Sequence, residues 1–154
     1  MNYDHITNVL PYTEPFLFVD ELTEVTENGV VGTYTFLEDS YFYKGHFKDV
    51  PVTPGVILTE CCAQIGVVCL GIYLLQNETN LPPRGMQRGM QIGMSSTQME
   101  FLLPVKPNEK VTVTSKKIYF RFNKLKCSVK MHNTEGKLVC TGEISGMFKT
   151  SAHA

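Results

Sequence analysis

The chain lacks the cysteine patterns that mark zinc-binding and disulfide-rich proteins. Its five cysteines are odd in number and include no Cys-x-x-Cys pair, and three of them lie in one apolar stretch (Cys61, Cys62, Cys69, Cys127, Cys140). This pattern argues against both a disulfide framework and a zinc site. We therefore expect reduced thiols in the core of a cytoplasmic protein.

Signals for export and for several domains are also missing. The N-terminal residues Met-Asn-Tyr-Asp-His are not followed by a basic stretch and an apolar run, so we expect no signal peptide. No repeat, low-complexity segment or linker interrupts the chain, which favours one domain over residues 1–154. A hydrophobic content of 43% and a charged content of 19% are typical of a soluble globular protein.

Net charge is small but unevenly distributed. The total of -1 gives no reason to expect a nucleic-acid partner. Residues 1–50 hold nine acids and two bases, giving -7, whereas residues 106–130 hold eight bases and one acid, giving +7. Either the two regions neutralise each other, or the second forms a basic face that steers an acidic protein or an anionic cofactor arm.

One segment, residues 54–75, is apolar and almost long enough to span a bilayer. Glu60 and Gln64 would then lie in hydrocarbon, where a charged side chain costs several kcal/mol. A buried helix beginning at Pro54-Gly55 and ending near Leu75 or Gln76 is the better interpretation, and we expect no membrane insertion.

The remaining pattern indicates about six strands. Apolar runs at Phe16–Thr26 and Val30–Leu37 flank the turn signal Glu27-Asn28-Gly29. Alternation over residues 125–132 predicts a half-buried strand, and a change of apolar phase predicts a bulge near Ser115–Lys117. Asn77–Ser96 is predicted to be a long, mobile connection. An α+β fold follows, with a curved antiparallel sheet wrapped around the helix and a partner subunit helping to cover it.

Candidate chemistry is concentrated between residues 45 and 64. His46 lies in a Gly/Pro-rich loop. Glu60 lies in a helix among apolar residues, and these surroundings should raise the pKa of its carboxyl and favour the protonated form, which can donate a proton. Gln64 lies one turn further on and could hydrogen-bond Glu60. The N–H of Gly55 at the helix start could bind a thioester oxygen as it gains negative charge. A base, an acid and an oxyanion site together serve proton transfer next to a carbonyl.

Each of these residues also has a plain structural interpretation. A lone histidine is usually structural or exposed, a buried glutamate can pair with a backbone group or a lysine, and Pro54-Gly55 can be only a helix start. His5, His132 and His153 lack comparable surroundings, and no matching cluster suggests a metal site. The joint occurrence of His46, Gly55 and Glu60 in one short stretch favours the catalytic interpretation.

This stretch resembles the 3-hydroxyacyl-acyl-carrier-protein dehydratases of the FabA/FabZ type. The resemblance rests on Gly45-His46-Phe47, on Pro51-Val52-Thr53-Pro54-Gly55 and on the acid Glu60. Leu10-Pro11 with Pro15–Asp20, and Phe101–Glu109, resemble the family's opening segment and a later strand and turn.

The resemblance implies the hotdog fold and a homodimer whose active sites combine His46 of one subunit with Glu60 of the other, with a trimer of dimers as a larger assembly. It also implies that the Gly55 N–H polarises the thioester carbonyl and that the Val52 carbonyl orients His46. Glutamate in the helix is similar to the FabZ branch. The acyl chain would be carried on the phosphopantetheine of acyl carrier protein, with no metal or redox cofactor.

The chain departs from the family at Tyr12-Thr13-Glu14, at Lys48-Asp49-Val50 and at Asn108. Asparagine tolerates the left-handed geometry of the glycine that is common at position 108. We expect dehydration of a 3-hydroxyacyl thioester to the trans-2-enoyl thioester, in fatty acid synthesis or in a polyene or other secondary lipid pathway. The alternatives are a hotdog thioesterase and a non-catalytic subunit of a heteromeric dehydratase.

The carrier protein is expected to meet basic residues. These are the residues between Lys106 and Lys130, or Arg84 and Arg88 in the long connection.

Overall fold

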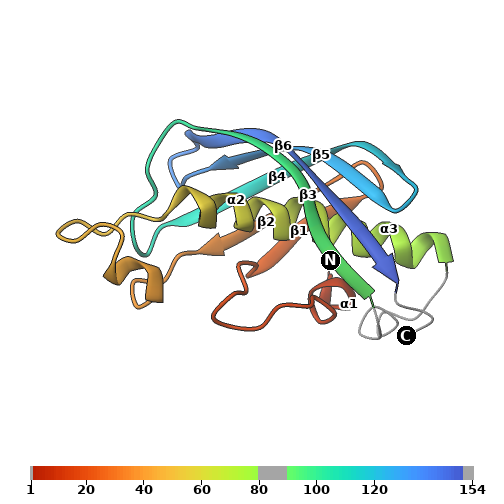
Figure 1. Ribbon diagram of the computed structural model, residues 1–154, viewed down its shortest axis with the longest axis horizontal. Helices are drawn as coiled ribbons and strands as arrows, with labels where there is room; N and C mark the ends of the chain where they lie inside the picture. Colours follow the sequence, from red (N-terminus) through yellow and green to blue (C-terminus); the bar gives the residue numbers. More distant parts are fainter. Residues whose placement is uncertain (1, 80–89, 151–154) are drawn as a thin grey trace.

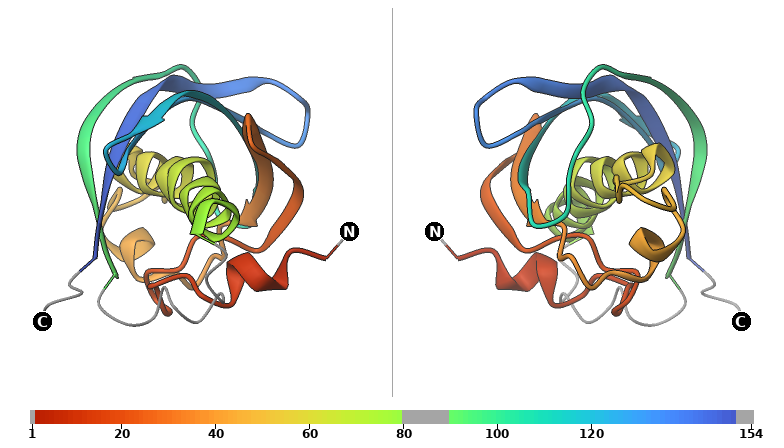
Figure 2. Two further views of the ribbon diagram at one scale, coloured as in Figure 1. Left: turned by 90° about the vertical axis from the view of Figure 1, so that its right-hand side faces the viewer. Right: turned by 90° about the vertical axis from the view of Figure 1, so that its left-hand side faces the viewer.

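A computed structural model describes residues 2–79 and 90–150 of the chain. Its elements are α1 (Asp4–Thr7), β1 (Glu21–Thr26), β2 (Gly29–Thr35), η1 (Tyr41–Lys44), α2 (Gly55–Ala63), η2 (Gln64–Cys69), α3 (Leu70–Thr79), β3 (Met90–Phe101), β4 (Lys110–Arg121), β5 (Lys124–His132) and β6 (Leu138–Thr150). The strands form one six-stranded antiparallel sheet in the order β1-β2-β4-β5-β6-β3. The sheet curves around a single helix formed by α2, η2 and α3 (Figures 1 and 2), as the sequence predicts.

Turn chemistry accounts for two of the hairpins in the sheet, β1–β2 and β4–β5. β1 and β2 meet at Glu27-Asn28, as expected from the turn signal there. β4 and β5 are joined by Phe122 and Asn123, whose φ angles are 52° and 60°. Two positive φ angles match the twist that a two-residue hairpin turn needs. The predicted bulge lies slightly further along, where the register of β4 on β5 shifts between Lys117 and Tyr119.

Two expected segments differ in the structure. The first strand begins at Glu21 and not at Phe16, because the backbone of Phe16 and Phe18 bonds to Gln64 in the helix. The predicted long connection over 77–96 is shorter, since α3 reaches Thr79 and β3 begins at Met90. β3 is held as an edge strand by its pairing with β6, which the local sequence does not reveal.

The helix changes geometry in its middle third. The six residues of η2 are in π-helical conformation, which leaves backbone groups without their usual partners. The hydroxyl of Ser115 on β4 donates to the Gly66 carbonyl at 2.8 Å and satisfies one of them. A Cβ at Gly66 would lie 2.9 Å from Val129, so a glycine is needed where the helix meets the sheet.

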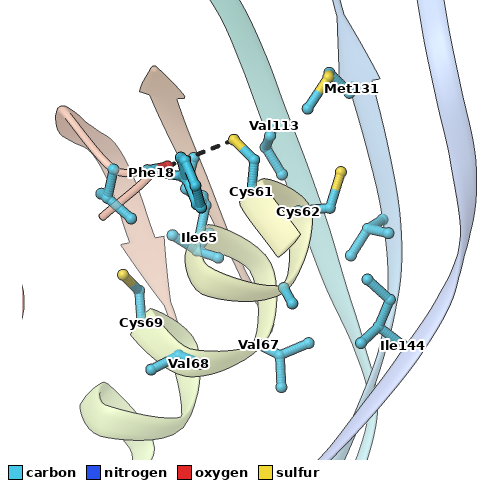
Figure 3. Close-up of a cluster of buried hydrophobic side chains, with 14 of the residues drawn as sticks. Phe18, Cys61, Cys62, Ile65, Val67, Val68, Cys69, Val113, Met131 and Ile144 are labelled. Carbon is cyan, nitrogen blue, oxygen red and sulfur yellow. Dashed lines mark hydrogen bonds between the residues drawn. The ribbon is translucent and has the colours of Figure 1, made fainter. Parts of the chain in front are cut away.

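The core lies between the concave face of the sheet and the helix (Figure 3). All five cysteines are buried free thiols, as predicted. Leu125, Cys127, Val129 and Met131 are fully buried, which confirms the alternation in β5. Gly55–Asn77 is long and apolar enough to cross a membrane, but 78% of its most apolar window is buried inside the protein. It is therefore the central helix of this fold.

Candidate active site

His46 lies in the loop between η1 and α2, and Val52 holds it at two points. The His46 ring Nδ1 lies 2.8 Å from the Val52 carbonyl oxygen, and the Val52 N–H donates to the His46 carbonyl at 2.8 Å. The loop is tied to the sheet side of the fold by Thr53, whose N–H donates to the Val105 carbonyl at 2.9 Å. The half-buried imidazole therefore has a defined orientation.

The partner of Nδ1 also determines which ring nitrogen can act as a base. A backbone carbonyl only accepts hydrogen bonds, so Nδ1 carries the proton and donates it to Val52. In the neutral ring the lone pair is then on Nε2. The contact between Val52 and His46 that the family resemblance implies is present, and it presents Nε2 as the basic atom.

Phe47 covers one face of the same imidazole. The two ring centroids are 4.0 Å apart and the ring planes are inclined by 26°. The Phe47 N–H donates to the Val50 carbonyl at 3.0 Å, which closes the loop beneath the ring pair. Phe47 remains 59% exposed, so much of its ring is not covered by the described residues.

Glu60 lies in the second turn of α2 and is half-buried. Desolvation by burial raises the pKa of its carboxyl, while a hydrogen bond from Gln64 opposes the shift by lowering it. Burial is the larger cause, so the carboxyl holds its proton to a higher pH than a free glutamate would. This is the direction that a proton donor near neutral pH requires.

Gln64 is fully buried, and its side chain makes three hydrogen bonds. Its Nε2 donates to Glu60 Oε2 at 3.0 Å and to the Phe16 carbonyl at 3.1 Å, and its Oε1 accepts from the Phe18 N–H at 2.8 Å. The predicted contact between Gln64 and Glu60 is therefore present. Gln64 also ties the N-terminal segment to the helix directly beside the carboxyl group.

Gly55 is the first residue of α2, and Pro54 before it supplies no side-chain cap. The first carbonyl that the helix offers is that of Pro54, which accepts from the Ile57 N–H at 2.9 Å, so the N–H groups of Gly55 and Val56 precede the helical hydrogen bonds and lie at the positive end of the helix dipole. A Cβ at Gly55 would lie 3.3 Å from the ring of Phe101, so a larger residue would crowd this helix start. The backbone N–H of Gly55 is thus placed where a carbonyl oxygen could be bound.

Within the described part of one chain, no hydrogen bond or ion pair joins His46 to Glu60. The structure brings together two pairs, His46 with Val52 and Glu60 with Gln64. The catalytic roles of these residues stay predictions. No group of three or more potential metal ligands occurs among the described residues.

Sequence reasoning missed three neighbours of the site. The backbone groups of Phe16 and Phe18 bond Gln64, and Tyr12 lies near enough for the Glu60 charge to contribute, after burial, to raising its pKa. Backbone acceptors have no sequence signature, so only the fold could identify them. The Tyr12 position is one at which the chain departs from the family's opening segment.

Comparisons with known proteins identify relatives in sequence. A family model described as the FabA-like domain matches residues 10–144. The chain is 32% identical over 148 residues to the 3-hydroxyacyl-(acyl-carrier-protein) dehydratase FabZ of Clostridium perfringens (strain SM101 / Type A), covering 94% of this chain and 96% of that protein. It is 42% identical over 82 residues to the FabZ of Acinetobacter baylyi, covering 53% of this chain and 54% of that protein.

Solved structures share the hotdog arrangement. The dehydratase heterocomplex ApeI:P from Xenorhabdus doucetiae aligns with a TM-score of 0.75 at 12% identity, covering 95% of this chain and 91% of that chain. A hypothetical thioesterase with coenzyme A from Streptococcus pneumoniae TIGR4 aligns with a TM-score of 0.58 at 17% identity, covering 84% and 85%. At such identities the likeness shows the fold alone.

Proposed function

The chain belongs to the FabA-like family, and from this we propose that it is a 3-hydroxyacyl-acyl-carrier-protein dehydratase of fatty acid or related lipid synthesis. The reaction removes water from a 3-hydroxyacyl thioester and leaves the trans-2-enoyl thioester. One observation carries the proposal: a single loop and the helix after it hold three suitable groups. These are the oriented base His46, the helix N-terminus at Gly55 and the half-buried carboxyl of Glu60, whose pKa is raised.

In the proposed mechanism, Nε2 of His46 takes the proton from the carbon next to the thioester carbonyl. The electron pair of that C–H bond forms the new double bond as the bond from C3 to its hydroxyl oxygen breaks. Protonated Glu60 gives its proton to the departing hydroxyl, which leaves as water. The Gly55 N–H binds the thioester oxygen as negative charge develops on it in the transition state. His46 gains one proton and Glu60 loses one, so the net charge of the enzyme does not change during the step.

Gln64 and Val52 act on the two catalytic groups without touching the reacting atoms. Val52 fixes the His46 tautomer and ring orientation. Gln64 holds the Glu60 carboxyl by one oxygen, at Oε2. Positioning of this kind matters because displacement of a catalytic group by about 1 Å can cost roughly 100-fold in rate.

We propose that the working unit is a homodimer, with His46 and Glu60 contributed by different subunits. Apolar side chains around the site support this, since Val56 on α2 is 76% exposed and Val50 in the loop is 64% exposed. Such side chains are suited to burial against a second copy. The acyl chain would lie in an apolar channel along the helix and this interface.

Mixing two inactive variants tests the shared site. His46→Ala and Glu60→Gln each remove one group, and re-assembled mixed dimers regain one complete site. Random mixing in equal amounts should restore about a quarter of wild-type activity, because half of the dimers are mixed and each carries one intact site of two. No recovery, with mixed dimers demonstrated by mass, would place both groups in one chain.

A basic surface on β4 and β5 supports acyl carrier protein as the donor of the substrate. Lys116, Lys124, Lys126 and Lys130 lie next to buried residues in the strand alternation and so face outward, and Arg121 is exposed at the end of β4. Lys126 pairs with Glu143 at 3.3 Å, and Phe122 at the hairpin tip is 93% exposed. An acidic carrier would find here both charge complementarity and an apolar anchor.

Charge reversal tests this docking. Lys124→Glu should raise the KM for a carrier-bound substrate and leave kcat/KM for a short pantetheine thioester unchanged. Lys137→Glu, in the turn between β5 and β6, is the matched control. Unchanged carrier affinity in Lys124→Glu would exclude this surface. The other proposed bases, Arg84 and Arg88, lie outside the described residues.

The reaction itself is tested by intact-mass spectrometry of acyl carrier protein loaded with a 3-hydroxyacyl chain. Loss of one water, abolished in His46→Ala and in Glu60→Gln, would establish the dehydratase and its two residues. Loss of the whole acyl group would instead establish a thioesterase, the activity named for several fold neighbours. An unchanged mass over a range of chain lengths would favour a non-catalytic subunit.

We also propose that the protein acts as a single domain and that it is located in the cytoplasm.

A further inference from the structure

The contact between Phe47 and His46 has a specific chemical meaning. The phenyl ring lies nearly parallel to the imidazole at 4.0 Å and 26°, so His46 faces the negative face of the ring and not its positive edge. A cation within about 6 Å of an aromatic centroid and over its face is attracted by the ring quadrupole. His46 is neutral before proton abstraction and becomes a cation during it.

We propose that Phe47 is a positioning residue that stabilises the imidazolium of His46 as it forms. The inference rests on the proposed function, in which His46 is the base. Because neutral imidazole gains less from the ring than imidazolium does, the contact strengthens as the reaction proceeds. An interaction that is stronger in the transition state than in the ground state raises kcat and leaves KM little changed.

The loop is built so that the ring pair stays together. Val52 bonds both the ring and the carbonyl of His46, and the Phe47 N–H is bonded to Val50. The His46 ring is therefore held by its own hydrogen bond, and the Phe47 backbone by another, within one closed loop. The Phe47 side chain is otherwise 59% exposed, and among the described residues its ring stacks on His46.

A graded series separates this electrostatic role from simple packing. Phe47 is replaced by 4-fluoro-, 3,5-difluoro- and 3,4,5-trifluorophenylalanine, which keep the ring shape and progressively remove charge from its face. The kcat for a 3-hydroxyacyl carrier substrate should fall steadily along the series, by about threefold to tenfold in total, with KM changed less than twofold. A kcat that does not vary with fluorination would overturn the proposal.

Natural substitutions provide the complementary test. Phe47→Trp should retain wild-type kcat, whereas Phe47→Leu should lose as much as the trifluorinated variant. Tyr41→Leu removes another half-exposed aromatic ring, outside the site, and should change neither constant. Equal kcat values for the leucine and tryptophan variants of Phe47 would show that only bulk matters.

The two proposals can fail separately. If the wild-type protein does not release water from any hydroxyacyl carrier, the proposed function fails before Phe47 is tested. If the wild type is active but the fluorinated series is flat, only the role of Phe47 is refuted. Sedimentation analysis of each variant shows whether its assembly matches the wild type, so a kcat change accompanied by altered assembly counts against the electrostatic role.

Discussion

Replacing Gln64 by methionine tests how much the buried hydrogen-bond hub contributes to stability. Methionine has a similar length and no amide, so all three hydrogen bonds of Gln64 are lost while the space stays filled. The Phe18 N–H is the most costly loss, because Phe18 is only 1% exposed and water cannot replace the partner. An unsatisfied buried group costs about 1–3 kcal/mol, and the Phe16 carbonyl adds a smaller share.

We therefore expect Gln64→Met to lower the free energy of unfolding by about 2–4 kcal/mol. Urea unfolding followed by circular dichroism measures it at equal protein concentration. Gln76→Met is the matched control, because Gln76 donates to the exposed His5 carbonyl, and it should cost less than about 1 kcal/mol. Equal losses in the two variants would refute the assignment of Gln64 as a stabilising hub.

The same substitution has an electrostatic consequence at Glu60. The hydrogen bond from Gln64 lowers the pKa of the Glu60 carboxyl, so removing it should raise that pKa further. Carboxyl carbon resonances followed across pH would show the Glu60 transition at higher pH in Gln64→Met than in the wild type. A transition at lower pH would contradict this direction of the shift.

Close contacts, buried charge and turn geometry support three more expected outcomes. In Gly71→Ala the new Cβ would overlap the ring of Phe148, so thermal unfolding should show a loss of about 1–3 kcal/mol that Phe148→Leu partly restores; an unchanged Tm would refute the overlap. Burial raises the pKa of Glu60, so the folded state binds the carboxyl proton more tightly than the unfolded state does. The stability that this proton contributes is present at low pH and is lost as the pH rises through the pKa of Glu60 in the folded state. Glu60→Gln should accordingly gain Tm relative to wild type at pH 8 but not at pH 4, and a gain that is the same at both pH values would contradict this. Phe122→Gly should stabilise the hairpin by up to about 1 kcal/mol in urea unfolding, because φ at Phe122 is 52° and glycine adopts this region without strain; a loss would mean that the exposed ring stabilises the fold.

Much of the fold could be predicted from local patterns. The turn between β1 and β2, the alternation in β5 and the continuous apolar helix each depend on residues close in sequence, and all three are confirmed. Asn108 is a further example, since its φ of 67° is the left-handed geometry expected where glycine is common. Local pattern was a poor guide at Phe16–Asp20 and at residues 90–96, because long-range hydrogen bonds decide the backbone there.

The candidate site divides in a similar way. The sequence alone draws attention to His46, Gly55 and Glu60. A carboxyl group is rare in an apolar helix, and here a histidine and a helix-starting glycine lie within a few residues before it. Their tautomer, pKa direction and partners depend on atoms that no local pattern identifies. The Val52 carbonyl makes Nε2 the basic atom of His46, and burial against the fold sets the direction of the Glu60 pKa.

Local sequence is enough to specify the single long helix, the strands of the remainder and the stretch that holds the candidate catalytic residues. Hydrophobic periodicity and turn residues act over a few positions, so they can be recognised without the folded structure. How these parts meet depends on the folded chain. Gln64 finds partners 46 and 48 positions away in the chain, and the hydroxyl of Ser115 satisfies a carbonyl of the π-helical segment across 49 positions. Such contacts depend on how a curved sheet closes around a helix, and this closure brings together groups whose separation along the chain carries no signal.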